Sequence, residues 1–221
     1  MNIMDIIGPV MVGPSSSHTA GAVKIGQISR KLLAEPVQQA EICFHGSFLA
    51  TGKGHGTDRA LVAGLLGLAV DDENIPNSFA IAAERNLTFS IHGIDLGDAH
   101  PNTVKMKLTG ESGRTLEIVA ASIGGGQIRI CEIDGLNANF CGEYPTLIVH
   151  NLDQPGHVTE VTSMLAHKSV NIATMQLYRD SRGGNAVMVI ECDQEVPQEA
   201  IRWLEHLEGI EKVTYLSLEE S

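Results

Sequence analysis

The last third of the chain repeats strand-like and helix-like hydrophobic patterns in a regular order. Four apolar runs rich in β-branched side chains predict strands, at residues 146–150, 170–178, 186–192 and 213–218. Residues 157–167 carry apolar side chains three and four positions apart behind a Pro-Gly turn, which predicts a helix. A second helix is predicted at 197–207, where proline occupies the first turn.

The glycine-containing segment 181–185 joins the two middle strands as a hairpin loop. The resulting order, β-α-β-β-α-β in about 70 residues, is the split pattern of the ferredoxin-like fold. We therefore expect residues 147–221 to form a domain of that class.

The preceding residues mix short strands with glycine-rich junctions. Alternating apolar side chains predict strands at 41–44, 87–91, 104–108, 116–119 and 128–131. Helices are predicted at 19–34 and 58–69. Loop-to-helix junctions or tight turns are predicted for the glycine-dense segments 13–26, 46–67 and 124–126. Residues 134–146 lack periodicity and are interpreted as a connector, so we expect an α+β protein with a mixed α+β domain at 1–140.

Composition and charge exclude several classes of function. The 221 residues include 15 basic and 27 acidic side chains, a net charge of −12, and only 4% aromatic residues. Such a chain repels polyanions and lacks base-stacking surfaces, so we expect no nucleic-acid partner. The longest apolar run, 61–70, falls far short of the ~20 residues that a membrane span needs. Residues 1–12 lack the basic start of a secretory signal, so we expect a cytoplasmic protein with no membrane association.

The cysteines do not predict a metal site in this chain. Cys43, Cys131, Cys141 and Cys192 lie far apart, with no C-x-x-C pair, and are expected to be buried free thiols. Residues 92–102 supply two histidines and two aspartates. We interpret this segment as a turn, with a metal site as the alternative.

A serine-rich segment, Gly13 to Gly21, precedes the first predicted helix and reads Gly-Pro-Ser-Ser-Ser-His-Thr-Ala-Gly. Free backbone N–H groups and the positive end of a helix dipole make such a junction suitable for a carboxylate or phosphate. One interpretation is an anion or substrate-carboxylate site with His18 as a polar participant. The other is a serine-rich helix cap with a surface histidine.

The segment His45 to Asp58 alternates glycines around Lys53 and His55. Its glycine spacing satisfies neither a phosphate-binding Walker A loop nor a dinucleotide fingerprint. A Schiff-base role for Lys53 is disfavoured by the small chain and its predicted fold. His55 is either a general base, since its pKa is intrinsically near neutral, or a solvated loop histidine, and both interpretations stay open.

Taken together, segments 13–19 (GPSSSHT) and 46–58 (GSFLATGKGHGTD) resemble the beta chain of bacterial iron–sulfur-dependent L-serine dehydratases. Residues 151–158 (NLDQPGHV) and 170–172 (VNI) independently resemble an ACT domain. The resemblance covers nearly the whole chain. The serine-histidine and glycine-histidine motifs are specific, whereas the ACT pattern is specific for fold and not for ligand.

The resemblance implies conversion of L-serine to pyruvate and ammonia with a [4Fe–4S] cluster. In this family the cluster ligands lie on a separate alpha chain, so the present chain would be half of an enzyme with L-serine as substrate. The resemblance also implies an ACT domain that forms a homodimer.

Site residues follow from the same motifs. His55 is the expected base, and His18 and Lys53 are the other expected catalytic residues. The expected substrate-binding residues are Ser15, Ser16, Ser17, Thr19, Gly54, Thr57 and Asp58. In ACT domains that bind amino acids, four positions contact serine. The residues at these positions in this chain are Asn151, Asp153, Gly156 and Asn171. The alternatives are a non-catalytic regulatory or assembly subunit whose ACT domain senses an amino acid or dimerises, and a small-molecule sensor unrelated to serine.

Overall fold

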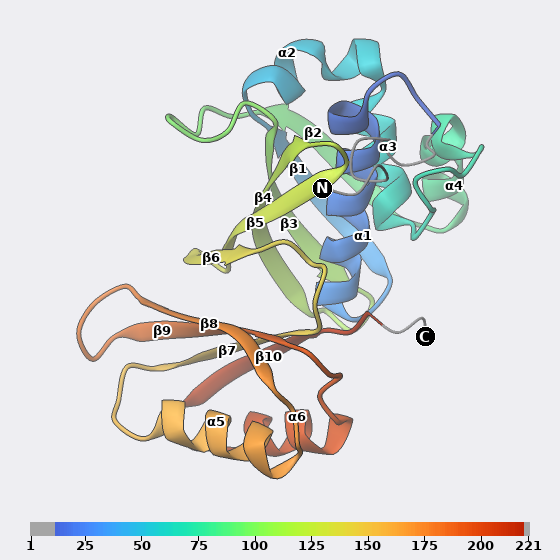
Figure 1. Ribbon diagram of the computed structural model, residues 1–221. Helices are drawn as coiled ribbons and strands as arrows, with labels where there is room; N and C mark the ends of the chain where they lie inside the picture. The colour runs from blue at the N-terminus through green and yellow to red at the C-terminus, as the bar shows by residue number, and fades with distance from the viewer. Residues whose placement is uncertain (1–11, 219–221) are drawn as a thin grey trace. The chain divides into compact units, whose positions relative to one another are not determined.

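The computed structural model describes residues 12–218, and the chain divides into two compact units, Met1–Asp134 and Gly135–Ser221 (Figure 1). We call them unit 1 and unit 2 and describe each by itself. No helix within residues 12–218 is both long enough and apolar enough to span a lipid bilayer.

Unit 1 is a mixed α+β structure. Its helical elements are η2 (Ser16–Ala20), α1 (Gly21–Leu33), α2 (Gly46–His55), α3 (Thr57–Leu65), η3 (Ile75–Asn77) and α4 (Ser78–Glu84). Its strands are β1 (Val37–Phe44), β2 (Thr88–Gly93), β3 (Thr103–Gly110), β4 (Thr115–Gly124) and β5 (Gln127–Ile133). They lie in the order β2-β1-β3-β4-β5, with β1 and β2 parallel and the other neighbours antiparallel.

One face of this sheet is apolar, because apolar residues alternate along each strand and lie opposite one another on neighbouring strands. Ile42 lies opposite Met106, and Met106 lies opposite Ile118, and all three side chains are buried. Helix α1 packs against β4 over this face, so the sheet and the helices share one core (Figure 1).

Two glycines bring α1 and α3 into close contact. A Cβ atom on Gly64 would lie 2.1 Å from the carbonyl oxygen of Val23, and one on Gly26 would lie 2.4 Å from that of Leu61. Both distances are below any real contact, so only glycine fits where the helices cross. The crossing fixes the ends of both helices relative to each other.

The prediction of a loop-to-helix junction in the glycine-dense segment 46–67 was wrong for residues 46–55, because these residues form helix α2. The ring of Phe48 is fully buried and packs edge-on against Phe44, with centroids 5.8 Å apart. An interior glycine costs a helix about 1 kcal/mol relative to alanine, and burying a phenylalanine contributes about 1.5–3 kcal/mol. Burial of Phe48 therefore offsets the two interior glycines, Gly52 and Gly54.

Unit 2 begins with β6 (Leu136–Phe140), inside the segment interpreted as a connector, so that interpretation was also wrong. Ala138 and Phe140 of β6 are buried, and the carbonyl oxygen of Asn139 accepts a 2.9 Å hydrogen bond from Gln176. Such tertiary contacts decide the conformation of a segment with so short an apolar pattern.

The remaining elements of unit 2 are β7 (Thr146–Leu152), α5 (His157–His167), β8 (Ile172–Arg179), β9 (Asn185–Cys192), α6 (Gln198–Glu205) and β10 (Ile210–Leu216). The antiparallel sheet has the order β10-β7-β9-β8. The predicted ferredoxin-like βαββαβ fold is thereby confirmed. Its core joins apolar residues of β7, β9 and both helices, including Leu147, Leu165 and Leu204.

Candidate functional site

The two motifs of unit 1 meet where η2 packs against α2. The imidazole rings of His18 and His55 have centroids 4.9 Å apart, and their planes are inclined by 43°. The ring of Phe48 contacts His18 edge-on, with the centroids 5.4 Å apart. We call His18, Ser47, Thr51 and His55 the histidine cluster.

Thr51 of α2 contacts both histidines. Its hydroxyl oxygen Oγ1 lies 3.0 Å from Nε2 of His18, and its carbonyl oxygen lies 3.2 Å from Nδ1 of His55. Ser47, one turn earlier in α2, places its Oγ 3.1 Å from the same Nε2 atom of His18. One face of a single helix therefore orients both rings.

The hydrogen bonds around His18 assign its tautomer. Thr51 donates its hydroxyl proton to the carbonyl oxygen of Ser47 at 2.9 Å, so the same hydroxyl accepts from Nε2 of His18. Ser15 accepts the backbone N–H of His18 at 3.1 Å, which leaves its own proton to face Nδ1 of His18 at 3.5 Å. Both patterns match a neutral imidazole with its proton on Nε2.

His55 has the opposite tautomer. A carbonyl oxygen only accepts, so Nδ1 of His55 carries the proton that points to Thr51. Its Nε2 atom then holds the lone pair, and within residues 12–218 this atom forms no hydrogen bond. Because the side chain is partly exposed, His55 offers a basic nitrogen to a ligand.

Burial and charge favour the neutral form of His18. Burial lowers the pKa of this imidazole below its usual value of 6.5, and the charge of a protonated His55 lowers it further. The hydrogen bond at Ser47 acts in the opposite direction and is the smaller effect. His18 is therefore uncharged at neutral pH, in agreement with its hydrogen bonds.

The backbone before α1 is shaped to hold His18 in this place. Residues 16–20 form a π-helical turn, a rare geometry that is frequent at functional sites, and Ser15 caps it. Gly13 has φ +132°, and a Cβ atom there would lie 2.5 Å from the side chain of Thr19. A Cβ atom on Gly21 would lie 2.1 Å from Oγ of Ser122. Both glycines let the serine-rich segment turn tightly onto the sheet.

The other residues predicted for this site are placed in three ways. Ser15, Ser16 and Ser17 are partly exposed beside His18. Thr19 and Thr57 are buried: Thr19 contacts the carbonyl oxygen of His55 at 3.5 Å, and the Thr57 hydroxyl has no hydrogen-bond partner among the described residues.

Lys53 and Gly54 lie on the exposed side of α2, and Lys53 forms no ion pair within residues 12–218. The carboxylate of Asp58 accepts the backbone N–H of Arg59 in the first turn of α3. The structure thus brings His18 and His55 together and leaves Lys53 outside this contact.

Ser47 and Thr51 are the members of the histidine cluster that the sequence did not predict. Their spacing of four residues places both hydroxyls on one helical face. That signal is readable only when residues 46–55 are recognised as a helix.

The described cysteines do not come together. All four are free and lie on separate strands or loops, and no group of three or more His, Cys, Asp or Glu side chains within residues 12–218 is arranged to hold a metal ion. Burial raises the pKa of each thiol, to about 11 for Cys192, which disfavours the thiolate that a metal requires. These residues do not fit an iron–sulfur cluster.

In unit 2, the residues predicted to bind an amino acid fall into two groups. Asn151, Asp153 and Gly156 follow one another at the end of β7. Strand β9 lies between β7 and β8 and serves as a ruler for the distance between the two groups. Asn151 of β7 lies opposite Ala186 of β9, and Ile172, which follows Asn171, lies opposite Cys192 of β9. At about 3.4 Å per residue along β9, roughly 20 Å separates the two groups. One copy of the chain does not bring Asn171 to the other three.

Asp153 and Asn171 already have partners. Asp153 accepts hydrogen bonds from the backbone of Gly183 at 3.0 Å and from Arg179 at 2.8 Å, and these bonds lower the pKa of its carboxyl group. The side-chain amide of Asn171 donates to Asp193 at 2.6 Å. Both contacts hold loops of unit 2 in place.

Two buried polar atoms, one at the end of β7 and one at the start of α5, lack hydrogen-bond partners among the described residues. They are Oδ1 of Asn151, which is 3% exposed, and Nε2 of His157, which is 7% exposed. A Cβ atom on Gly209 would lie 2.5 Å from that nitrogen. The sequence did not predict His157 as a site residue, because a histidine at the start of a helix carries no distinctive pattern.

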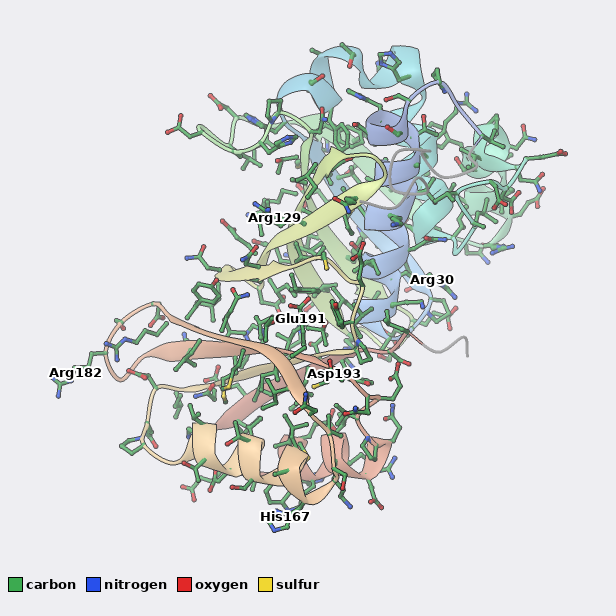
Figure 2. The ribbon with its side chains drawn as sticks, in the orientation of Figure 1. Arg30, Arg129, His167, Arg182, Glu191 and Asp193 are labelled. Carbon is green, nitrogen blue, oxygen red and sulfur yellow. The ribbon has the colours of Figure 1, made fainter. Side chains whose placement is uncertain are left out.

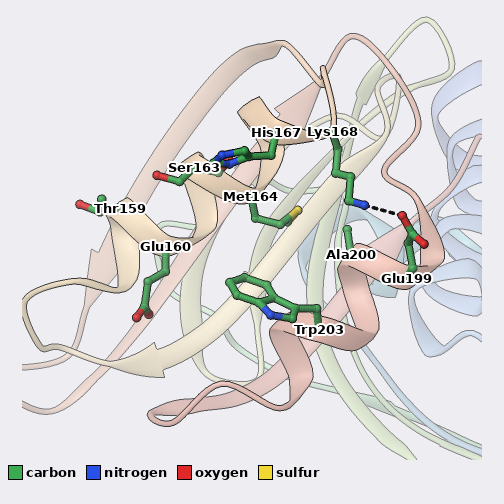
Figure 3. Close-up of a pocket in the computed structure, with 9 residues that line it drawn as sticks. All are labelled: Thr159, Glu160, Ser163, Met164, His167, Lys168, Glu199, Ala200 and Trp203. Atoms are coloured by element: carbon green, nitrogen blue, oxygen red, sulfur yellow. Dashed lines mark hydrogen bonds and ion pairs between the residues drawn. The ribbon is translucent and has the colours of Figure 1, made fainter.

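A cavity of about 710 Å³ lies between α5 and α6, with Met164, Ala200 and Trp203 at its apolar surface (Figure 3). Lys168 and Glu199 form an ion pair across its edge (Figure 3). Trp203 is 48% exposed there. The cavity contains none of the residues predicted to bind an amino acid.

Comparison with known proteins agrees with the motifs. A family model described as serine dehydratase beta chain matches residues 2–86. The chain is 39% identical over 216 residues to a probable L-serine dehydratase, beta chain, of Bacillus subtilis (strain 168), with 98% of each chain covered. It is 38% identical over 195 residues to the L-serine dehydratase, beta chain, of Peptoniphilus asaccharolyticus, with 88% of each chain covered.

A further similarity is to D-3-phosphoglycerate dehydrogenase of Bacillus subtilis (strain 168), at 30% identity over 201 residues. The match covers 89% of this chain and only 37% of that enzyme, so it concerns one part of a longer protein. The similarity to the two beta chains, in contrast, extends over nearly the full length of both partners. The chain belongs to the family of L-serine dehydratase beta chains.

Proposed function

We propose that this chain supplies the substrate-facing residues of an L-serine dehydratase that also contains an alpha chain. The observation that carries the proposal is the histidine cluster, in which Thr51 orients two imidazoles and leaves Nε2 of His55 as a basic nitrogen. Membership of the beta-chain family supports the choice of L-serine as substrate and of a second chain as partner.

In the proposed reaction, Nε2 of His55 removes the proton from Cα of L-serine. The electron pair of that bond forms the Cα–Cβ double bond while the hydroxyl group leaves Cβ as hydroxide. The proton taken up by His55 balances this leaving group, so that the net product is water. The resulting aminoacrylate tautomerises to an imine, which water hydrolyses to pyruvate and ammonia. General-base catalysis of this kind typically contributes about 10²–10⁴-fold to a rate.

The neutral His18 has a supporting role in this proposal. It is an uncharged, hydrogen-bonded neighbour of His55, and the centroids of the two rings are 4.9 Å apart. The hydroxyls of Ser16 and Ser17, partly exposed beside it, would donate to the substrate carboxylate, while the hydroxyl of Ser15 is engaged by His18. Lys53, exposed on α2, is left to attract the carboxylate group of the substrate or to contact the partner chain.

We assign the [4Fe–4S] cluster expected for this family to the alpha chain. The described cysteines of the present chain are spread over both units and do not converge. Cluster ligands are thiolates that meet at one point. A cluster bound by four cysteines therefore has its ligand set on another chain in this proposal.

The test is serine-dependent pyruvate release by this chain mixed with its alpha partner under anaerobic conditions. His55→Ala should lower turnover by about 10²–10⁴-fold while the visible absorbance of the cluster stays intact. His92→Ala, on the exposed side of β2, is the matched control and should keep wild-type turnover. Near-normal turnover of His55→Ala, or full activity of this chain without its partner, would refute the assignment.

A second function is favoured by the unpartnered atoms of unit 2. We propose that unit 2 is an ACT domain that binds an amino acid between the end of β7 and the start of α5, where Asn151 and His157 have unused hydrogen-bonding capacity. The chain would then have a regulatory or assembly role, as a homodimer, whether or not unit 1 is catalytic.

Isothermal titration of the full chain with L-serine tests the regulatory function. Heat of binding that persists in His55→Ala and disappears in Asn151→Ala would support a site in unit 2. If only His55→Ala loses the heat of binding, serine binds in unit 1. If the wild-type chain gives no heat, unit 2 does not bind serine and its remaining role is in assembly.

A further inference from the structure

A second cavity of unit 1, of about 440 Å³, lies at the opposite end of α1 from the histidine cluster. It is lined by Arg30, Pro36, Val37, Gln38, Leu65, Leu66, Arg85, Asn86, Leu87 and Glu111. These residues come from the ends of α1, α3 and α4, the start of β1 and the turn after β3. Two arginines and several aliphatic side chains therefore share one hollow.

The two guanidinium groups approach the same peptide unit. Nη1 of Arg85 donates a 3.1 Å hydrogen bond to the carbonyl oxygen of Leu66. The side chain of Arg30 packs on the next residue, since a Cβ atom on Gly67 would lie 3.3 Å from Nε and 3.7 Å from Cζ of Arg30. Figure 2 shows Arg30 near the C-terminal end of α1. Leu66 and Gly67 therefore each contact one of the two arginine side chains that line the cavity.

These charges are not neutralised by the described part of the chain. The side chain of Arg30 forms no hydrogen bond or ion pair within residues 12–218, and Arg85 has only the carbonyl of Leu66. Glu111 lines the cavity but lies beyond 4.0 Å of any basic group described. Glu35, on the neighbouring turn, accepts hydrogen bonds from the hydroxyl and backbone N–H of Ser112.

This arrangement is unusual for so acidic a chain. With 27 acidic and 15 basic side chains, carboxylate partners are plentiful, yet neither arginine that lines this cavity forms an ion pair within residues 12–218. An anion bound in a cavity lined by two cations offsets their mutual repulsion and accepts their unused N–H groups. Leu65, Leu66 and Leu87 meanwhile supply an apolar wall.

We propose that this cavity binds a small organic anion, whose carboxylate or phosphate group lies between Arg30 and Arg85 and whose apolar body contacts the leucines. The site is distinct from the histidine cluster. His18 and Arg30 are separated by 12 positions along η2 and α1, or about 18 Å at ~1.5 Å per residue. The proposal does not depend on the reaction assigned to His55.

Binding is tested on the full chain with butyl phosphate, pentanoate and, as the uncharged reference, butanol. The readout is the movement of the arginine Nε–H and leucine methyl signals in nuclear magnetic resonance spectra. Saturable shifts at Arg30, Arg85 and Leu87 with an anion and not with butanol are expected. The stronger of the two anions identifies phosphate or carboxylate as the recognised group.

Three substitutions then locate the site. Arg30→Gln and Arg85→Gln should each weaken anion binding by about tenfold or more, since each removes charged hydrogen-bond donors. Arg129→Gln makes the same change in charge on β5 of the same unit and should leave binding unchanged (Figure 2).

Glu111→Gln is the most decisive variant because it should strengthen anion binding. It removes the one carboxylate that lines the cavity, and a damaged fold cannot mimic a gain in affinity. Anions that bind no better than butanol, or an affinity unaffected by all three cavity substitutions, would overturn the proposal.

Discussion

The two units use their polar side chains differently. In unit 1, Nε2 of His55 has no hydrogen-bond partner within the described residues, and its side chain is partly exposed. In unit 2, Asp153 is engaged by Arg179 and Gly183, and Asn151 and His157 are buried. Unit 1 therefore presents a group that can react, whereas unit 2 presents groups that can bind or hold a loop.

The difference also appears in how the groups are supported. The histidine cluster rests on one face of the ten-residue helix α2, which includes three glycines. The polar residues of unit 2 stand at the ends of strands in a regular sheet with a continuous apolar core. Damage to the core of one unit should therefore be separable from damage to the chemistry of the other.

The largest expected effect comes from Leu204→Ala in α6. Leu204 is fully buried in the core of unit 2, and truncating a buried leucine costs about 2–5 kcal/mol. Hydrogen exchange of the full chain should show protection lost in β7, β9, α5 and α6 and kept in α1 and α3. Loss of protection in α1 and α3 to the same degree would show that the two units unfold as one.

Gly64→Ala should give the next largest effect, and in unit 1. The added methyl group would lie 2.1 Å from the carbonyl oxygen of Val23, so α1 and α3 must separate, at a cost of about 1–3 kcal/mol. Gly54→Ala is the matched control. It has open space and lies inside α2, so it should stabilise the chain by about 0.5–1 kcal/mol. Urea unfolding measures the free energy of unfolding of both variants. If both substitutions stabilised the chain, or both destabilised it, the close contact of α1 and α3 at Gly64 would not explain the result.

The sequence predicted unit 2 more completely than unit 1, for a physical reason. In unit 2 the side chains that fill the core recur at the strand and helix periods, so Leu147, Val149, Val161 and Leu165 reveal the elements directly. In α2 the helix is held by one buried ring, Phe48, and by contacts with residues distant in the sequence. Its glycines favour the prediction of a loop, and the segment has no apolar periodicity that would predict a helix instead.

The candidate site was predictable in part. The residue patterns alone left His18 and His55 open between a functional and a structural role, and the resemblance of both motifs to a known family selected them. Their contact was not predictable from spacing, since it depends on how η2 packs against α2. The roles of Ser47 and Thr51 depend on the helical conformation of residues 46–55, which the sequence did not show.

A smaller effect, on activity alone, is expected from Thr51→Val. Valine keeps the shape and the carbonyl group that orients His55 but removes the hydroxyl bonded to His18. The loss of one neutral hydrogen bond is about 1 kcal/mol, so kcat for serine should fall by about five- to tenfold. Thr51→Ser restores the hydroxyl and should recover most of the activity.

Thr51 is a positioning residue in this account, and the pH profile separates that role from simple loss of stability. Without the hydroxyl, Nε2 of His18 keeps only Ser47 as a side-chain partner, so the support of His18 beside His55 is weakened. The acidic limb of the profile should therefore move in Thr51→Val and not in Thr51→Ser. A uniform decrease at every pH, with the limb unmoved, would contradict the role assigned to Thr51.

The smallest expected effect is on the pH dependence of stability. The pKa of His18 lies below 6.5 in the folded chain, mainly because of burial, and near 6.5 in the unfolded chain. On acidification the unfolded state therefore takes up a proton first. The contribution of His18 to stability is complete above about pH 6.5 and is lost as the pH falls through 6.5 toward the lowered value.

Urea unfolding of the full chain at several pH values between 5 and 7.5 measures this contribution. In His18→Gln, the free energy of unfolding should decrease less steeply as the pH falls. The change in slope corresponds to at most one proton taken up on unfolding, because one titratable group is removed. His92→Gln, at an exposed position of β2, should leave the decrease unchanged. Because His18 lies in unit 1, the transition that flattens must be the one reported by α1 and α3. Flattening confined to unit 2 would show that the acid-sensitive group of the chain lies outside the histidine cluster.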